Sequence, residues 1–213
     1  MSSVAVIDYG MGNLHSIAKA LQFVAPESVI QVSADPDVIR HADRVVFPGV
    51  GAIRDCMAQL RERKLIDVIK DVSTDKPFLG ICLGLQALLE HSEESGKVEC
   101  LGLFRGSVVR FENALGSDGN PLKIPHMGWN CVRQTRAHPL WTGIPQDTRF
   151  YFVHSYHAQT SDAACIAGTA DYPTPFTCAL SRDNLFAVQF HPEKSQTMGL
   201  KLLRNFTTWD GQH

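Results

Sequence analysis

The chain has 213 residues, a formal net charge of −2 and 44% hydrophobic residues. This length suits one large or two small domains, and the charge argues against the basic surface that binds nucleic acid. No apolar stretch approaches the roughly 18 residues of a membrane-spanning helix, and the N-terminus lacks the features of a signal peptide. The six cysteines are scattered without zinc-ligand spacing. We therefore expect a reduced, cytoplasmic protein without a metal site.

The first half of the chain alternates short apolar strands with helices. Strands are expected at 4–9, 29–33, 45–47 and 77–81, and helices at 14–24 (capped by Asn13), 36–41 and 52–70. This alternation predicts a parallel sheet with helices on both faces. Because no linker separates the two halves, we expect residues 1–213 to form a single domain.

A glycine-rich turn follows the first strand, at residues 8–14 (DYGMGNL). It resembles a dinucleotide-binding fingerprint, but His15 stands where the third glycine belongs. The acidic residue expected about 20 positions further on would be Asp35, which precedes a proline in a turn. A nucleotide-binding module is therefore a weak alternative.

The strand at 45–47 is followed directly by residues 48–51 (PGVG). Two glycines allow the backbone N–H groups of Gly49, Val50 and Gly51 to approach a developing oxyanion. Taken alone, the segment is more simply interpreted as an ordinary strand-to-helix turn.

The most informative stretch is residues 80–84 (GICLG), between the strand at 77–81 and an expected helix at 85–91. A G-x-nucleophile-x-G pattern at a strand-to-helix turn is a nucleophile elbow, here with Cys82 as the nucleophile. The helix N-terminus favours the thiolate, which is the attacking form. The N–H of Leu83 would be the second oxyanion donor. The alternative is a buried structural thiol, because free cysteine is among the most buried residue types.

The second half of the chain is rich in strands. Strands are expected at 106–111, 129–133, 150–153, 164–170, 177–181 and 186–190, with a hairpin turn at 182–184, an exposed loop at 113–121 and a final helix at 195–208. Residues 191–195 (HPEKS) follow the last of these strands, where active-site loops of open α/β sheets gather. His191 could take the proton of the thiol, and Glu193 could orient the imidazole and stabilise its cation.

These motifs together resemble the class I (triad-type) glutamine amidotransferases over nearly the whole chain. The resemblance implies an α/β fold with an open mixed, mostly parallel sheet flanked by helices. It makes Cys82 the nucleophile, His191 the base, Glu193 the orienting acid and Gln86 a ligand of substrate glutamine. It implies neither a cofactor nor a metal.

The segments 8–14, 125–130 (PHMGWN), 151–156 (YFVHSY) and 189–195 are similar to those of the glutaminase subunits of imidazole glycerol phosphate synthases. This resemblance implies a heterodimer with a separate (β/α)₈ cyclase, which uses the ammonia in histidine biosynthesis. It also implies that Ser155 and Tyr156 offer backbone groups to glutamine. Asn13, Trp129 and Lys194 lie in segments that would face the partner.

Two other enzymes remain open: a glutaminase subunit of another amidotransferase, and a thiol hydrolase that works without a partner. Turnover at full rate without a partner would indicate the second. Strand geometry predicts that His154 and His157 lie on opposite faces, so that they form no metal pair.

Overall fold

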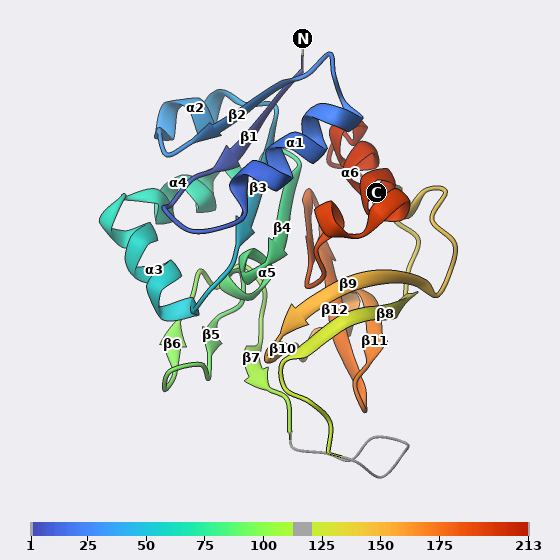
Figure 1. The fold of residues 1–213 in the computed structure, drawn as a ribbon. Helices are drawn as coiled ribbons and strands as arrows, with labels where there is room; N and C mark the ends of the chain where they lie inside the picture. The colour runs from blue at the N-terminus through green and yellow to red at the C-terminus, as the bar shows by residue number, and fades with distance from the viewer. Residues whose placement is uncertain (1, 113–120, 213) are drawn as a thin grey trace.

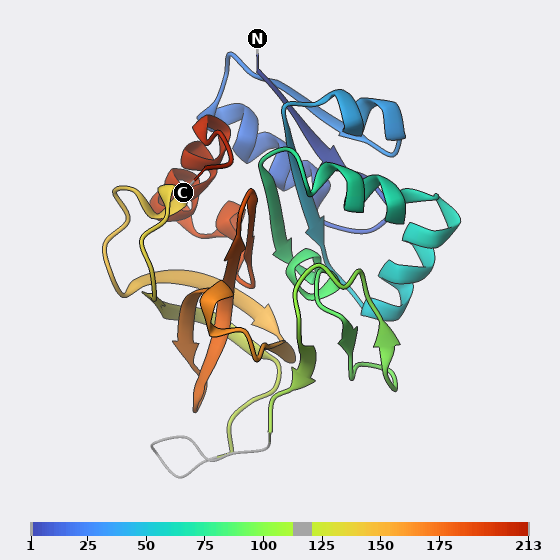
Figure 2. The same ribbon diagram turned by 180° about the vertical axis from the view of Figure 1, so that it is seen from behind.

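The computed structural model describes residues 2–112 and 121–212. The expected loop at 113–121 therefore lies outside the described residues except for Pro121. Figure 1 shows an open sheet with helices on both faces, and Figure 2 shows the same chain from behind. Among the described residues, no helix is both long and apolar enough to cross a membrane.

The first half forms the parallel part of the sheet. Its elements are β1 (Ser3–Ile7), α1 (Leu14–Val24), β2 (Val29–Ser33), α2 (Pro36–His41), β3 (Arg44–Gly49), α3 (Ile53–Glu62), α4 (Leu65–Val72), β4 (Phe78–Cys82) and α5 (Leu83–Ala87). The strands pair in the order β2-β1-β3-β4, all parallel. Burial on both faces explains why β1, β3 and β4 are largely apolar, whereas the edge strand β2 is mostly exposed.

The second half adds mostly antiparallel strands and one last helix. Its elements are β5 (His91–Ser92), β6 (Val98–Glu99), β7 (Ser107–Arg110), β8 (His126–Gln134), η1 (Pro139–Trp141), β9 (Thr148–His154), β10 (Tyr156–Gln159), η2 (Ala163–Cys165), β11 (Ile166–Asp171), β12 (Pro175–Arg182), β13 (Leu185–Val188), η3 (Pro192–Lys194) and α6 (Gln196–Thr208). Strand β13 pairs parallel with β4 and antiparallel with β12, so it joins the two halves. The predicted α/β fold with a mixed sheet flanked by helices is confirmed.

Alternation along the strands divides the buried side chains between two cores. In β1, Val4 and Val6 pack toward α1 and α6, whereas Ala5 and Ile7 pack toward α2, α3 and α4. Burying one such large aliphatic side chain contributes about 1.5–3 kcal/mol. The sheet is therefore held from both sides, and its strand ends are fixed points for a site.

Two helix predictions were wrong in detail. The expected helix at 52–70 is broken into α3 and α4 by Lys64, whose φ of 57° is left-handed. Leu60 and Leu65 are both buried, and in one unbroken helix they would point about 140° apart. The break brings both onto the core. The helix after Cys82 ends at Ala87 rather than residue 91, because His91 already belongs to β5.

Asn13 precedes α1 as expected, but its side chain makes no capping hydrogen bond. The turn predicted at 182–184 is confirmed, since Arg182 pairs with Leu185 across it.

The carboxyl ends of β3, β4 and β13 lie at one edge of the sheet, where Gly49 pairs with Cys82 and Val188 with Ile81. The loops that follow these three strands therefore meet.

Candidate active site

Cys82 lies at the turn between β4 and α5 in a conformation that few side chains adopt. Its φ is 55° and its ψ is −110°, and it is 7% exposed. Such backbone strain persists only where the surrounding structure over-determines it. In this turn, the residue with the strained backbone angles is Cys82 itself. Gly84 serves close packing instead, because a Cβ there would lie 1.9 Å from the carbonyl oxygen of Phe47.

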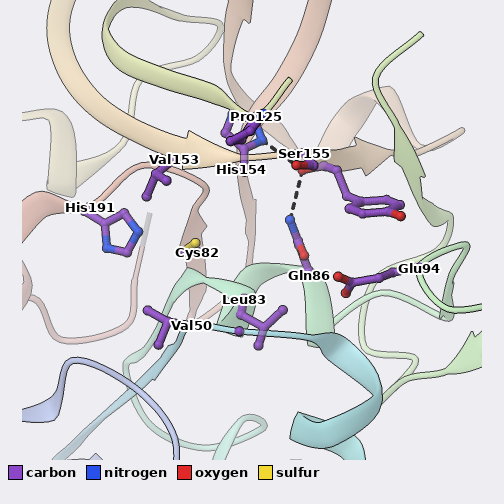
Figure 3. Close-up of a pocket in the computed structure, with 12 residues that line it drawn as sticks. Val50, Cys82, Leu83, Gln86, Glu94, Pro125, Val153, His154, Ser155 and His191 are labelled. Atoms are coloured by element: carbon purple, nitrogen blue, oxygen red, sulfur yellow. Dashed lines mark hydrogen bonds between the residues drawn. The ribbon is translucent and has the colours of Figure 1, made fainter. Parts of the chain in front are cut away.

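His191 and Glu193 face the elbow from the loop after β13. Nδ1 of His191 lies 2.9 Å from Oε1 of Glu193, and both side chains are nearly fully buried. Because the carboxylate accepts, Nδ1 donates and Nε2 is left for the Cys82 side of the pocket (Figure 3). Within the described chain, Nε2 has no hydrogen-bond partner.

The charge balance of this pair favours an imidazolium. Burial alone would lower the pKa of His191, but its interactions with Cys82 and Glu193 raise that pKa to about 10.

The backbone of the loop is fixed as well. The hydroxyl of Ser195 donates to the carbonyl of His191 at 2.6 Å and accepts from the N–H of Tyr151 at 3.0 Å. The base is thus held in place by Glu193 and by Ser195.

The segment at 48–51 borders the same pocket. Val50, Gly51 and Leu83 line it, and Val50 is 37% exposed. Gly51 has a φ of 94°, a value that favours glycine. Gly49 does not line the pocket but packs behind it, because a Cβ at Gly49 would lie 2.4 Å from the hydroxyl of Tyr9.

The pocket has a volume of about 310 Å³, at the lower end of the range for small-molecule sites. Residues 50–94 and residues 125–191 contribute different walls of the pocket (Figure 3). The lining residues are Val50, Gly51, Cys82, Leu83, Gln86 and Glu94 on one side and Pro125, Val153, His154, Ser155, Tyr156 and His191 on the other. A ligand in this space would contact the thiol and the imidazole together.

Glu94 lines the pocket although its sequence context does not mark it as a site residue. Its Oε2 accepts the N–H of Ile53 at 2.8 Å, so the carboxylate sits at the N-terminus of α3. Figure 3 shows its side chain beside that of Gln86. In the sequence, residues 93–96 (EESG) have only the composition of a polar turn, and no signal connects them with the elbow.

The three predicted glutamine-contacting residues all reach the pocket. Nε2 of Gln86 donates to the carbonyl of Tyr156 at 2.9 Å and to Oε1 of Gln189 at 3.0 Å. The carbonyl of Ser155 accepts the N–H of Phe111 at 3.1 Å. The backbone carbonyls of Ser155 and Tyr156 therefore already accept hydrogen bonds from groups of the protein itself.

The prediction that His154 and His157 lie on opposite faces was wrong. Both rings pack on Phe111, with centroid distances of 5.1 and 4.6 Å. The prediction assumed one continuous strand, but the chain leaves β9 at His154 and enters β10 at Tyr156. Among the described residues, no group of three or more potential ligands could hold a metal ion.

His154 belongs to a buried hydrogen-bonded chain. Its Nδ1 lies 2.8 Å from the carbonyl of Tyr156, and its Nε2 lies 2.9 Å from Nδ1 of His126. Burial lowers the pKa of His154 to about 3 and that of His126 to about 4. Both imidazoles are therefore neutral, with Nδ1–H as the donor in each.

The glycine-rich turn at 8–14 packs against the segment at 48–51 rather than forming an open cradle. A Cβ on Gly12 would lie 3.9 Å from Cα of Gly49, and a Cβ on Gly51 would lie 2.8 Å from the end of the Met11 side chain. This packing gives the turn a structural role beside the pocket, which weakens the nucleotide-binding alternative.

The residues expected to face a partner lie near the pocket. Trp129 is 38% exposed, and its ring centroid lies 6.1 Å from that of Tyr151. Nζ of Lys194 lies 6.0 Å from the same Tyr151 ring. Neighbouring Met127 is 61% exposed. Asn13 directly precedes α1, which contacts η3.

An α/β fold that brings a cysteine and a histidine to one pocket, with a glutamate bonded to the histidine, is typical of enzymes with a thiol nucleophile. The family model described as glutamine amidotransferase class-I matches residues 5–208. The chain therefore belongs to the class I glutamine amidotransferases, which confirms the resemblance.

Several relatives share more than half of their residues with this chain. Proteins called imidazole glycerol phosphate synthase subunit HisH are 63% identical in Methylococcus capsulatus (99% of this chain, 98% of the relative), 61% in Nitrosococcus oceani (99% of each) and 58% in Pseudomonas putida (100% of each).

Two solved structures share the fold at low sequence identity. One is a putative GMP synthase subunit from Thermoplasma acidophilum, with a TM-score of 0.70 and 22% identity over 97% of this chain and 92% of that chain. The other is PurLQS from Thermotoga maritima, with a TM-score of 0.70 and 16% identity over 96% of this chain and 97% of that chain. These likenesses bear on the fold alone.

Proposed function

We propose that this chain is the glutaminase subunit of an imidazole glycerol phosphate synthase. It hydrolyses glutamine to glutamate and ammonia. The observation that carries this proposal is the strained Cys82, which shares a pocket with His191, whose Nδ1 is bonded to Glu193. The matches with relatives of that subunit name extend over 98–100% of each relative's length, which supports the assignment over the whole chain. A continuous sheet from β2 to β6 supports treating residues 1–213 as one domain.

The chemistry follows from the positions of the three side chains. The Cys82 thiolate attacks the side-chain carbonyl of glutamine and forms a tetrahedral intermediate. His191, charged and oriented by Glu193, gives its proton to the departing ammonia. The resulting thioester is hydrolysed by water, which loses a proton to the now neutral His191. N–H groups of the 48–51 segment and of Leu83 stabilise the oxyanion in both steps.

Substrate recognition is assigned to the polar part of the pocket wall. The carboxylate of Glu94 is suited to the α-ammonium group of glutamine, although it also binds the N–H of Ile53. Gln86 contributes its amide from α5, and Ser155 and Tyr156 contribute backbone groups from the opposite wall. A pocket with both charge and fixed amides selects an amino acid over a plain amide.

The ammonia passes to a separate (β/α)₈ cyclase subunit in a heterodimer. The cyclase forms imidazole glycerol phosphate and aminoimidazole carboxamide ribotide in histidine biosynthesis. The docking face includes Asn13, Trp129 and Lys194. Exposed Met127 and Trp129 are the type of residue enriched at interfaces, which supports this location. A closed route between the subunits is expected, because ammonia released to water becomes ammonium.

The test uses the complex with the cyclase and the Cys82→Ala variant. Glutamine-dependent synthesis should fall by about 10⁶-fold, on the scale of nucleophile removal in a serine hydrolase. Synthesis from added ammonium salts should persist, because the cyclase site is untouched. Glutamine turnover that survives the substitution, or a wild-type complex that makes no product from glutamine, would refute the proposal.

A further inference from the structure

Gln189 is a fully buried polar residue that the mechanism above does not use. It follows β13, its backbone N–H donates to the carbonyl of Cys178 at 2.8 Å, and it stands two residues before His191. Its Nε2 lies 3.6 Å from Sγ of Cys82. Burying an amide is unfavourable unless its polar atoms are bonded, so its partners indicate what the amide does.

The orientation of this amide follows from one backbone carbonyl. The oxygen of Tyr156 can only accept, so the Gln86 atom 2.9 Å away must be Nε2. The same Nε2 lies 3.0 Å from the Gln189 side chain, which must present Oε1 to it. The Gln189 atom facing Cys82 is then Nε2, a donor. The same carbonyl accepts from His154, so both halves of the network agree.

We propose that Gln189 is a positioning residue for the nucleophile, which donates a side-chain N–H to Sγ of Cys82 and holds the thiolate in its attacking position. This inference rests on the proposed glutaminase function and extends it by one residue.

Two physical effects support this role. A hydrogen bond to a charged acceptor is stronger than one between neutral groups, so the donor favours the thiolate over the thiol. The bond also limits where the sulfur can move, and small displacements of a nucleophile cost large factors in rate. Because Gln86 lines the pocket and bonds to Gln189, the sulfur and the substrate wall are held by one network.

The experiment compares Gln189→Met with Gln189→Glu in the complex with the cyclase. The Met variant removes the donor without adding charge. The Glu variant keeps an acceptor for Gln86 and replaces the donor with an oxygen. Gln134→Leu is the matched control, because the amide of Gln134 bonds to the carbonyls of Ile144 and Pro145 in the loop between β8 and β9.

Two readouts separate positioning from folding. The first is kcat and KM for glutamine. The second is the pH dependence of alkylation of Cys82 by iodoacetamide, followed by mass spectrometry of the peptide because Cys131 is exposed and also reacts. Alkylation needs no glutamine, so it reports on the thiol even if the proposed function fails.

Both Gln189 variants should lower kcat by about 10–100-fold, the scale of a lost hydrogen bond to a charged group. In both, the alkylation profile should move to higher pH, whereas Gln134→Leu should match the wild type. KM should change little in Gln189→Glu, where Gln86 keeps its acceptor. Wild-type kcat and an unshifted profile in Gln189→Glu would overturn the inference and leave Gln189 as an anchor for Gln86. If the wild type does not turn over glutamine but the alkylation profiles of the Gln189 variants still shift, the proposed function is refuted and the contact between Gln189 and Cys82 is retained.

Discussion

The elbow and the 48–51 segment lie side by side at the sheet edge, but they are held in different ways. Cys82 and Leu83 are 7% and 3% exposed, and Gly84 packs so closely on Phe47 that no side chain would fit. Val50 is 37% exposed, and what meets Gly51 is the flexible end of Met11. The nucleophile is therefore fixed by the core. In the 48–51 segment, Pro48 and Gly49 are still held in β3, but Val50 and Gly51 extend beyond the strand and are exposed.

This difference indicates where a partner can control the reaction. A buried elbow cannot respond to docking without disturbing both cores. The exposed end of the segment, Val50 and Gly51, can change one peptide orientation at small cost, and one oxyanion donor is worth about 10²–10³ in rate. We propose that the cyclase controls hydrolysis through the 48–51 segment and leaves the elbow unchanged.

Among the tests of this comparison, the largest effect is expected on the fixed side, at Glu193. Glu193→Gln keeps the size of the side chain but removes the charge that stabilises the His191 cation. We expect kcat to fall by about 10²–10³-fold, less than the roughly 10⁴-fold loss in a serine triad because a thiol ionises more easily. Steady-state glutamine hydrolysis in the complex measures it. A variant within twofold of the wild type would remove Glu193 from the mechanism.

We also expect Glu193→Gln to change how the free energy of unfolding depends on pH. The pKa of His191 is raised from 6.5 to about 10, so its stabilising contribution is complete below about pH 6.5 and is lost as the pH rises toward 10. Without the carboxylate, the raised pKa should fall and this loss should shrink. Urea unfolding at pH 6, 8 and 10 should give a shallower decline in the free energy of unfolding for Glu193→Gln than for the wild type. Equal declines would contradict the cause assigned to the shift.

A pair of alanine substitutions compares the two regions directly. Gly84→Ala places a Cβ 1.9 Å from the Phe47 carbonyl oxygen, and should reduce the free energy of unfolding by about 3 kcal/mol or more. Gly51→Ala meets only a flexible side chain, and its φ of 94° should cost about 1–2 kcal/mol. Urea unfolding measures both. If Gly51→Ala is the more destabilising, the contrast between a fixed elbow and an adaptable segment is wrong.

The smallest effects are expected at the exposed face. Trp129→Ala or Lys194→Ala should weaken cyclase binding by about 1–2 kcal/mol, more than most interface residues but less than a hot spot, with little change in stability. Titration of the cyclase measures the binding. Phe23→Ala is the control, because Phe23 is an aromatic residue 75% exposed on α1, outside the proposed docking face. Equal losses for Trp129→Ala and Phe23→Ala would show that the docking face has been assigned wrongly.

Much of the fold follows from the sequence because its signals are local. The helix Leu14–Val24 and the strand Val29–Ser33 match the predicted bounds. The break at Lys64 could not be predicted, because nothing in its neighbours requires a left-handed residue. It is the burial of both Leu60 and Leu65 that demands the break.

The residues of the site also differ in whether the sequence alone could identify them. Cys82 and His191 could be selected because each follows an apolar strand in a recognisable motif. Glu94 and Gln189 could not, since their roles depend on contacts across the sheet: Glu94 with the N-terminus of α3, and Gln189 with Cys82 and Gln86. The error at His154 and His157 has the same origin, because one residue outside the strands changed which way the rings point.

The most direct test of partner control is steady-state glutamine hydrolysis by the isolated chain, repeated with saturating cyclase and its nucleotide ligand. We expect a low rate for the isolated chain and an increase of about 10²–10³-fold in the complex, the value of one oxyanion donor. Alkylation of Cys82 should be unchanged by the partner, because the elbow is already formed. An isolated chain that hydrolyses glutamine at the full rate of the complex would show that the cyclase does not control hydrolysis through the 48–51 segment.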